Sequence, residues 1–277
     1  MVKKTVLSLS LISILLGGCT IASAPTPSET SASVSDADLE AAYDAYQAVL
    51  ETYVDADGLV DYVALQQNRG QLDQFNGAIA VVSDDTYNSW TEADQIAFWV
   101  NAYNSLTLAS IIDQEPIRDI KDIVGVWRIR QHPIQGQSKT LDNIEHQTLR
   151  VDFNEPRIHA ALVCAAISCP LLRNEPFRGE NLDAQLEDQV QTFLAKADGF
   201  RIDQAEGKVY LSTIFQWFGE DWIPTYGVDS GFAGNASEQA VLNFISNYVS
   251  AEEKAYLEAG DYQIIYLDYD WSLNVQS

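Results

Sequence analysis

The stretch EADQIAFWVNAYNSLTLASII, residues 92–112, decides the fold because it is apolar on nearly every side of a helix. Ser89 and Glu92 have the spacing of a capping box, which predicts that the helix begins beside them. A helix that is apolar all round lies at the centre of a domain, so the stretch predicts a buried central helix. Its apolar side chains include Ile96, Ala97, Phe98, Trp99, Val100, Tyr103, Leu106 and Leu108.

Upstream of this helix, apolar residues at spacings of three and four predict a first helix that begins after Ser35. The sequence Asp-Ala-Asp-Gly at residues 55–58 then predicts a turn. It begins like a calcium loop, but Gln66 stands where such a loop needs a bidentate Glu. A turn is therefore expected here and not a calcium site.

Downstream, helices alternate with short strands. The apolar run at residues 158–167 fits a buried strand and a buried helix equally well. These patterns predict an α+β fold: a helix-rich single domain at residues 36–277, with a small antiparallel sheet around the buried central helix. The other expected elements are a short helix at 141–149, a helix at 182–194 closed by Gly199, a hairpin of 200–202 with 209–211, helices near 213–221 and 237–249, and a strand at 263–267.

The first residues have the pattern of an export signal. Lys3 and Lys4 precede an apolar run, residues 6–16, which is shorter than the roughly 20 residues that a helix needs to span a bilayer. The run ends in Leu16-Gly17-Gly18-Cys19, which resembles the lipobox of bacterial lipoproteins. This resemblance implies that Cys19 is acylated and becomes the new amino terminus.

Under this interpretation, residues 1–18 form a lipoprotein signal peptide, and residues 19–35 form the lipid anchor and a flexible Ser/Thr/Ala/Pro tether. Two or three acyl chains, palmitate among them, hold a protein firmly on a membrane. The residue after Cys19 is Thr20 and not Asp, which favours the outer membrane. We therefore expect a protein lipid-anchored to a cell membrane, on the periplasmic face of the outer membrane.

Composition narrows the classes of partner. Loss of residues 1–18, two of them lysines, leaves 259 residues and changes the formal net charge from −24 to −26. Phosphate binding needs clustered Lys and Arg, so this charge argues against nucleic acid as a partner. With 47% hydrophobic residues the chain is expected to fold and not to be a disordered acidic tail.

Cys164 and Cys169 are the two cysteines that remain if Cys19 is acylated. An exported protein meets an oxidising compartment, where a disulfide is permitted. Five residues span about 7.5 Å along a helix and about 16 Å along a strand, whereas a disulfide needs Cα atoms within about 6.8 Å. We therefore expect two free thiols, unless residues 165–168 form a turn.

Three stretches of the chain resemble the family called domain of unknown function 547. They are FWVNAYN at 98–104, residues 141–164 with Ser-Cys-Pro at 168–170, and YDWSLN at 269–274. The resemblance extends over about residues 55–275 and implies no activity, because none is assigned to the family. The positions that match its motifs are Asn101, Asn104, Glu145, His146, His159, Cys164 and Ser168-Cys169-Pro170.

The thiol that best fits a catalytic role is Cys164. Plant members of the family read Ser-Ser-Pro where this chain has Ser168-Cys169-Pro170, so the resemblance gives Cys169 the weaker claim. His159 is five residues from Cys164, which places the two side chains apart on a strand and on a helix alike. A base for Cys164 must therefore come from another segment. The candidate is His146, with Glu145 or another carboxylate to orient it.

Asn101 and Asn104 share one face of the central helix and need hydrogen-bond partners there. They either hold a neighbouring loop, or one of the two side-chain amides donates to an oxyanion. Asn104 and Arg157 are the candidate binding residues. A metal site would need ligands such as His146, His159 and Cys164, but no short ligand spacing supports one, so neither metal nor cofactor is expected.

Two functions fit this pattern. The first is an envelope module without catalytic activity that binds or supports a peptide, protein or glycan. The alternative is a thiol-dependent hydrolase or acyltransferase with Cys164 as nucleophile and a histidine base. Either function predicts that the polar side chains of the apolar segments meet at one patch. The residues expected there are Asn101, Glu145, His146, His159 and Cys164.

Overall fold

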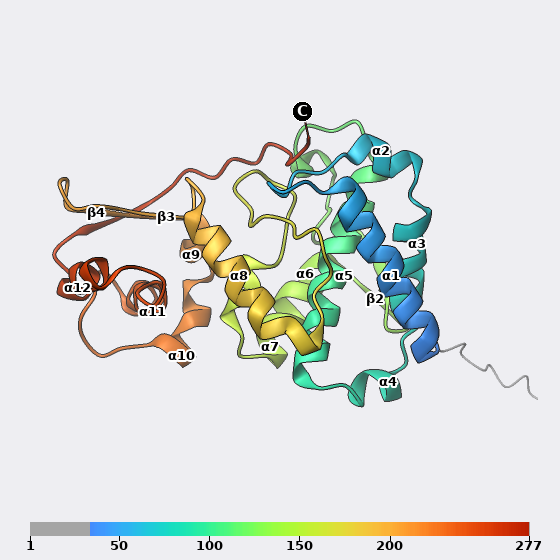
Figure 1. The fold of residues 1–277 in the computed structure, drawn as a ribbon, viewed down its shortest axis with the longest axis horizontal. Coiled ribbons are helices and arrows are strands. Elements are labelled where there is room, and N and C mark those ends of the chain that lie inside the picture. The colour runs from blue at the N-terminus through green and yellow to red at the C-terminus, as the bar shows by residue number, and fades with distance from the viewer. Residues whose placement is uncertain (1–33, 277) are drawn as a thin grey trace, which may run out of the picture. The chain divides into compact units, whose positions relative to one another are not determined.

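The computed structural model describes residues 34–276, which belong to one compact unit, Ser33–Ser277. The leader, Cys19 and all of the tether except its last two residues lie outside the described residues. Within the described part the protein is a helix-rich α+β domain, as the sequence predicted (Figure 1). No helix among residues 34–276 is both long and apolar enough to cross a bilayer.

The central helix is α5, Glu92–Ile112, and every residue from Ile96 onward is buried. Its capping box differs from the predicted one, because Thr91 and Asp94 form it. Ser89 instead ends the short helix α4, Asp84–Asn88, where its hydroxyl donates to the Thr86 carbonyl. Ser89 is therefore the C-cap of α4, and the N-cap of α5 is Thr91, two residues later.

Three helices that precede α5 in the sequence form one group with it (Figure 1). The expected first helix is α1, Asp36–Tyr53, and it is followed by α2, Tyr62–Gln67, and α3, Gly70–Ala80. Helices α2 and α3 pack on α5, and α1 packs on α3. Between α1 and α2 the predicted turn is present, and Gly58 has a φ of 71° there. A Cβ at Gly58 would lie 2.8 Å from Leu171 Cβ, so this turn packs closely on a later loop.

The carboxy-terminal half has a second apolar core. It is made chiefly by the helices α8 (Leu182–Ala195), α9 (Thr213–Phe218) and α11 (Ala236–Ile245) and by the three-stranded sheet described in the next paragraph. Figure 1 shows these yellow to red elements beside the group around α5. Helix α12 was not expected from the sequence. The helices are α6 Leu141–Ile144, α7 Arg150–Asp152, α8 Leu182–Ala195, α9 Thr213–Phe218, α10 Ile223–Tyr226, α11 Ala236–Ile245 and α12 Ala251–Ala259, with 3₁₀ turns at Ile120–Asp122, Pro156–Ala160, Gly179–Asn181 and Gly219–Trp222.

The strands form two small sheets. The first is an antiparallel pair, β1 His132–Ile134 with β2 Gln137–Lys139. In the second, the expected hairpin of β3 Phe200–Asp203 and β4 Lys208–Leu211 is joined by β5 Gln263–Tyr266. Strand β5 pairs parallel to β4, so this sheet is mixed and not wholly antiparallel as predicted. It packs on the second core and not on α5.

The apolar run at 158–167 is neither of the two elements considered. It makes one 3₁₀ turn, Pro156–Ala160, and continues as an irregular buried segment. Its backbone is hydrogen-bonded by the Asn104 side chain of α5 instead of by a neighbouring strand or helical turn. The Asn104 amide donates to Ala161 O (3.0 Å), and its oxygen accepts from Val163 N (2.9 Å). A buried irregular backbone needs such side-chain partners.

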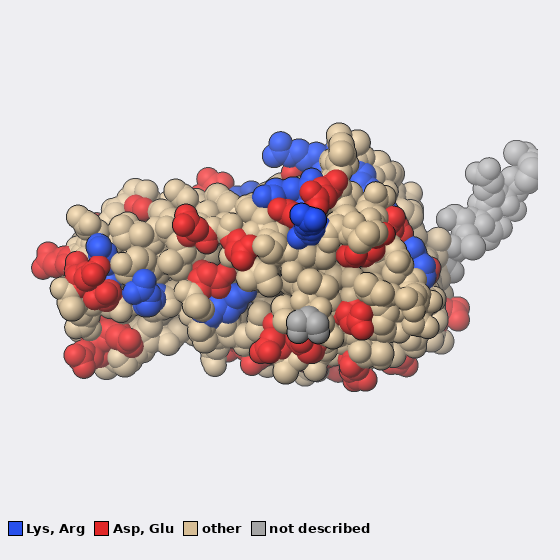
Figure 2. Space-filling view, turned by 90° about the horizontal axis from the view of Figure 1, so that it is seen from above, with Lys and Arg blue, Asp and Glu red and all other residues tan. Residues whose placement is uncertain are grey.

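The surface carries the charge that the composition implies. On the face drawn in Figure 2, acidic side chains are scattered over the surface and basic ones occur in separate small groups beside them. Most of the described arginines lie within ion-pair distance of Asp or Glu, among them Arg69, Arg150 and Arg173. Such pairing leaves no extended basic stripe on this face.

Candidate functional site

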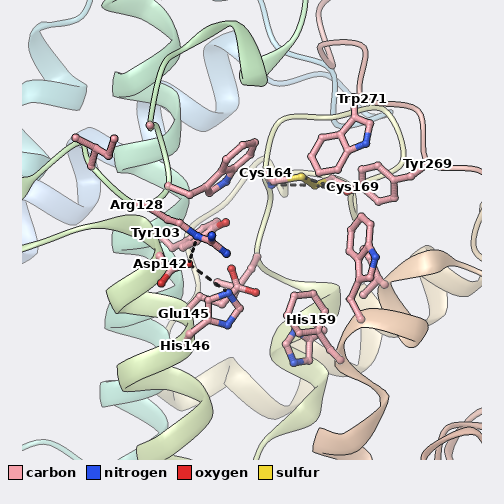
Figure 3. A pocket seen from close by; sticks show the side chains of 17 residues that line it. Tyr103, Arg128, Asp142, Glu145, His146, His159, Cys164, Cys169, Tyr269 and Trp271 are labelled. Atoms are coloured by element: carbon pink, nitrogen blue, oxygen red, sulfur yellow. Dashed lines mark hydrogen bonds and ion pairs between the residues drawn. A yellow bond between two sulfur atoms is a disulfide. The ribbon is translucent and has the colours of Figure 1, made fainter.

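A cavity of about 590 Å³ opens beside α5 and collects residues from six separate segments (Figure 3). Of the residues that the sequence singled out, Glu145, His146, His159 and Cys164 line it. Asn101 is not among its lining residues. The other lining residues are Tyr103, Gly125, Trp127, Arg128, Ile129, Asp142, Leu162, Cys169, Ile214, Trp217, Phe218, Tyr269 and Trp271.

The two cysteines of the cavity form a disulfide, so the expectation of free thiols was wrong. Residues 165–168 make the turn that a bridge required, and the Cα atoms of Cys164 and Cys169 are 6.1 Å apart. Ala165 has a φ of 65°, a backbone conformation that regular helices and strands do not contain. Cys164 and Cys169 do not lie on one helix or strand, so the distances expected along a regular element do not apply to them.

Both sulfurs contact polar donors. The hydroxyl of Tyr269 lies 3.1 Å from Cys169 Sγ and 3.2 Å from Cys164 Sγ. The backbone N–H of Cys164 donates to Cys169 Sγ at 2.9 Å. No histidine is a hydrogen-bond partner of either sulfur within residues 34–276. The side chain that contacts the two sulfurs of the disulfide is thus the hydroxyl of Tyr269, and not the imidazole base expected from the sequence.

Glu145 and His146 reach the cavity from a single π-helical turn, Glu145–Leu149, which continues α6. A capping box of Thr140 and Asn143 fixes the start of α6, and the Thr148 hydroxyl donates to Asn143 O across the wider turn. Single π turns of this kind frequently occur at functional sites because they rotate side chains out of the α-helical register.

Burial raises the pKa of Glu145 to about 7, although Tyr103 and Arg150 act in the opposite direction. The carboxyl group therefore gains and loses its proton near neutral pH, which an ordinary glutamate does not do. Carboxyls perturbed in this way concentrate in functional sites. Figure 3 shows Glu145 on the side of the cavity opposite Tyr269 and Trp271, with the disulfide between them along one edge.

A hydrogen-bonded chain joins the two histidines. Arg150 donates to His146 Nδ1 (3.0 Å) and to Asp221 Oδ1 and Oδ2 (2.8 and 2.6 Å), and Asp221 Oδ2 lies 2.7 Å from His159 Nε2. Burial alone would raise the pKa of Asp221, but the hydrogen bonds from Arg150 and His159 hold it well below its usual range. Burial also lowers the pKa of both imidazoles, so they are neutral at pH 7.

Aromatic rings form the side of the cavity opposite Glu145, which we call the aromatic wall. Trp217 and Trp271 are stacked with ring centroids 5.8 Å apart, and Tyr269 contacts both rings at 4.8 and 4.6 Å. Trp127 meets Trp271 edge-on at 6.0 Å. Phe218 extends this wall and stacks on His159 at 4.2 Å. Trp217 is 44% exposed, so the wall is open to ligands in solution.

The remaining predicted residues lie elsewhere and hold the framework. Asn101 donates to Phe177 O (2.8 Å) and accepts from Phe177 N (2.9 Å), so its amide is fully used by a loop and not by an oxyanion. Asn104 holds the backbone of the buried segment as described above. Arg157 pairs with Glu155 (2.6 Å) and Asp183 (2.9 Å) outside the cavity.

Some residues of the site were missed by sequence analysis. Tyr269 and Trp271 belong to a stretch that carried the family resemblance, which was their one signal. Asp221 and Trp217 had no signal, because they enter through contacts between residues distant in the sequence. Among the described residues 34–276, no group of three or more His, Cys, Asp or Glu is placed to hold a metal ion.

Residues 87–194 match the model of a family described as Protein of unknown function, DUF547. This match supports the resemblance seen in the sequence and includes Glu145, His146, His159 and Cys164. It ends before α9 and before Tyr269, so part of the aromatic wall lies beyond the matched segment. Comparisons with curated proteins and with solved structures gave no match.

Proposed function

We propose that this protein is an envelope-anchored binding module whose cavity takes an apolar or aromatic side chain of a peptide or protein segment. The observation that carries the proposal is the open aromatic wall, in which Trp217 stacks on Trp271 and Tyr269 contacts both rings at a tilt. Large aromatic side chains left partly exposed around a cavity of about 590 Å³ favour a ligand site, because ligand pockets are lined mainly by apolar and aromatic side chains.

The polar groups of the cavity favour a peptide over a glycan. His159 is held by Asp221, and His146 accepts from Arg150. Asp142 interacts with Arg128 at 3.4 Å. A sugar ring needs several uncommitted donors and acceptors for its hydroxyls, whereas an apolar side chain needs ring contacts and few polar partners.

The test is a binding titration with two ligand panels, one of short peptides rich in Phe, Tyr, Leu and Met, and one of oligosaccharides from the bacterial cell wall. We expect saturable binding of peptides from the first panel and none from the second. Binding of oligosaccharides alone would contradict the peptide proposal.

Two matched variants locate the binding. Trp217→Ala removes the most exposed ring and should weaken peptide affinity about 10- to 30-fold, as a buried aromatic contact of roughly 1.5–2 kcal/mol implies. Val63→Ala trims an apolar side chain on α2 that is 56% exposed and does not line the cavity. It should bind as the unmodified protein does, and equal loss in both variants would contradict this location.

The anchor is part of the same proposal. The pattern Leu16-Gly17-Gly18-Cys19 after a basic and apolar leader supports acylation of Cys19 and attachment to a cell membrane. We assign the domain to the periplasmic face of the outer membrane on the strength of Thr20 at the position after the cysteine. Peptide or protein ligands would then be components of the envelope.

A thiol-dependent hydrolase or acyltransferase is the second candidate. In its favour, Cys164 lines the same cavity as Glu145, His146 and His159. It requires reduction of the disulfide, since a bridged sulfur is not a nucleophile. An electrophilic acyl probe should label Cys164 in reduced protein and not in Cys164→Ala. Absence of labelling in the reduced protein would remove this candidate.

A further inference from the structure

The disulfide is exposed unequally. Cys169 is 2% exposed and belongs to the apolar core, whereas Cys164 is only partly buried. Both line the cavity, and Cys164 is the more exposed of the two. In thiol–disulfide exchange the attacking thiolate needs access to one sulfur, and the other sulfur leaves. The difference in exposure therefore distinguishes an attacked sulfur from a leaving sulfur.

The hydrogen bonds give the same assignment. The backbone N–H of Cys164 donates to Cys169 Sγ at 2.9 Å, and the Tyr269 hydroxyl approaches it at 3.1 Å. The Tyr269 hydroxyl lies near both sulfurs, so the backbone N–H is the donor that distinguishes Cys169. A hydrogen bond to a thiolate stabilises it, which speeds its departure. Cys164 Sγ has the Tyr269 hydroxyl alone as its hydrogen-bonding neighbour in the described part of the chain.

The loop between the cysteines is held by contacts that do not depend on the disulfide. Ile167 N donates to Ser272 O (2.9 Å), and Ser168 N donates to Asp270 O (3.2 Å). Lys196 Nζ donates to the carbonyls of Ile167 and Cys169, both at 2.6 Å. A bridge that closes so short a loop restricts the unfolded chain less than one that closes a long loop, so its contribution to stability is at the low end for disulfides.

We propose that Cys164–Cys169 is a redox-active disulfide that exchanges with cysteine thiols of a peptide or protein, with Cys164 as the attacked sulfur and Cys169 as the leaving sulfur. This activity goes beyond ligand binding by the aromatic wall. It needs no cofactor, because the second reactant is itself a thiol or a disulfide.

The step balances as follows. A substrate thiolate forms a bond to Cys164 Sγ, the bond between the two cysteines breaks, and its electron pair leaves on Cys169 Sγ. A second thiol of the same substrate, once deprotonated, attacks the mixed disulfide and releases Cys164 as a thiolate. The substrate dithiol is oxidised to a disulfide, and the two cysteines are reduced by two electrons. A peptide or protein disulfide reverses the sequence and restores the bridge.

The proton acceptor lies in the same cavity. Glu145 lines it. Burial raises the pKa of Tyr269, and the charges of Asp198 and Glu145 add to this shift. With its own pKa at about 7, Glu145 takes up and releases a proton in the pH range in which thiols exchange. The protons of the two substrate thiols end on the two cysteines. Glu145 lines the cavity into which the substrate thiols enter, and Tyr269 is the hydroxyl that contacts the two sulfurs.

The first test separates the two sulfurs with single-cysteine variants of the full chain and glutathione disulfide as probe. In Cys169→Ser, a glutathione adduct should form on Cys164. In Cys164→Ser, adduct formation on the enclosed Cys169 should be at least about tenfold slower. Peptide mass spectrometry measures both rates. Equal rates, or faster reaction at Cys169, would overturn the assignment.

The second test keeps both cysteines and remains informative if a cysteine variant fails to fold. Tyr269→Phe removes the donor to the leaving sulfur and should slow reduction of the native disulfide by reduced glutathione about tenfold. Tyr266→Phe is the matched control, because its hydroxyl bonds Glu238 (3.0 Å) outside the cavity, and it should not change the rate. Equal rates in the two variants would overturn the proposal.

The same reduction assay in low concentrations of urea distinguishes exchange in the native protein from exchange after unfolding. A redox-active bridge should be reduced at a rate that urea does not change below the unfolding transition. A rate that rises with urea in step with global unfolding would show a purely structural disulfide and would overturn the proposal. Peptide binding by the aromatic wall would be unaffected by that result.

Discussion

Glu145 shows how a single residue can connect stability to the site. Its pKa is raised from 4.5 to about 7, chiefly because burial disfavours the charged carboxylate. Below pH 4.5 the carboxyl is neutral in both the folded and the unfolded state. Between pH 4.5 and 7 the unfolded chain loses this proton while the folded protein keeps it, so the contribution of Glu145 to the free energy of unfolding falls as pH rises.

We therefore predict that Glu145→Gln is more stable than the unmodified protein at pH 8 and equal to it at pH 4. The raised pKa corresponds to a difference of up to about 3 kcal/mol at pH 8. Urea unfolding at the two pH values measures it, and comparison of the two proteins at each pH cancels the effect of the histidines. A Gln variant that is less stable at pH 8 would contradict this account of the carboxyl.

Asn101 illustrates a motif residue whose role is structural. Asn101→Ala leaves the buried N–H and C=O of Phe177 without partners and should lower the free energy of unfolding by about 3 kcal/mol. Ser110→Ala is the control on the same buried helix, where the hydroxyl donates only to Leu106 O one turn earlier. We expect a loss below about 1 kcal/mol there. Comparable losses in chemical denaturation would refute the loop-holding role.

At the scale of elements, what could be predicted from the sequence depended on periodicity. Helices α1 and α8 have apolar spacings that identify them, α5 is apolar on nearly every side, and the strands of the β3–β4 hairpin flank a polar turn. The structure confirms all of them. The segment after Pro156–Ala160 has no such spacing, because side chains of α5 and backbone near the carboxy terminus pair with it. Contacts between distant residues leave no periodic pattern, and for this reason the turn at 165–168 was not predicted.

The stability that the disulfide adds to the segment between Cys164 and Cys169 can be measured. Because the bridge closes a loop of about five residues, we predict that its reduction costs roughly 2 kcal/mol and leaves the domain folded. The backbone bonds of Ile167 and Ser168 to the 270–272 segment persist without it. Urea unfolding with and without dithiothreitol measures the cost. Loss of cooperative unfolding on reduction would show that the bridge is needed for folding.

At the scale of the whole molecule, the leader predicts where the domain works. Cys19→Ser should move the protein from the membrane fraction to the soluble envelope fraction, since the acylated sulfur is the expected anchor. Thr20→Ser keeps the cysteine and should leave the protein in the membrane. Fractionation of cells followed by immunoblotting distinguishes these outcomes, and Cys19→Ser protein retained in membranes after leader cleavage would argue against a lipid anchor.

The candidate site is also a property of the whole molecule. Glu145, His146, His159 and Cys164 could be selected from the sequence because they lie in motif stretches, and the fold places all four around one cavity. The aromatic wall could not be foreseen, since Trp217 and Trp271 come from α9 and from the carboxy-terminal segment. Their meeting depends on how the second core packs beside the first, which no local pattern encodes.

The central claim is that this cavity binds the ligand, and the indole N–H signals of the tryptophans test it directly by nuclear magnetic resonance. The chain has six tryptophans. Trp127, Trp217 and Trp271 line the cavity, whereas Trp90, Trp99 and Trp222 do not. During a peptide titration the account predicts shifts in the first three signals and constant positions for the other three. Shifts confined to the second set would contradict it.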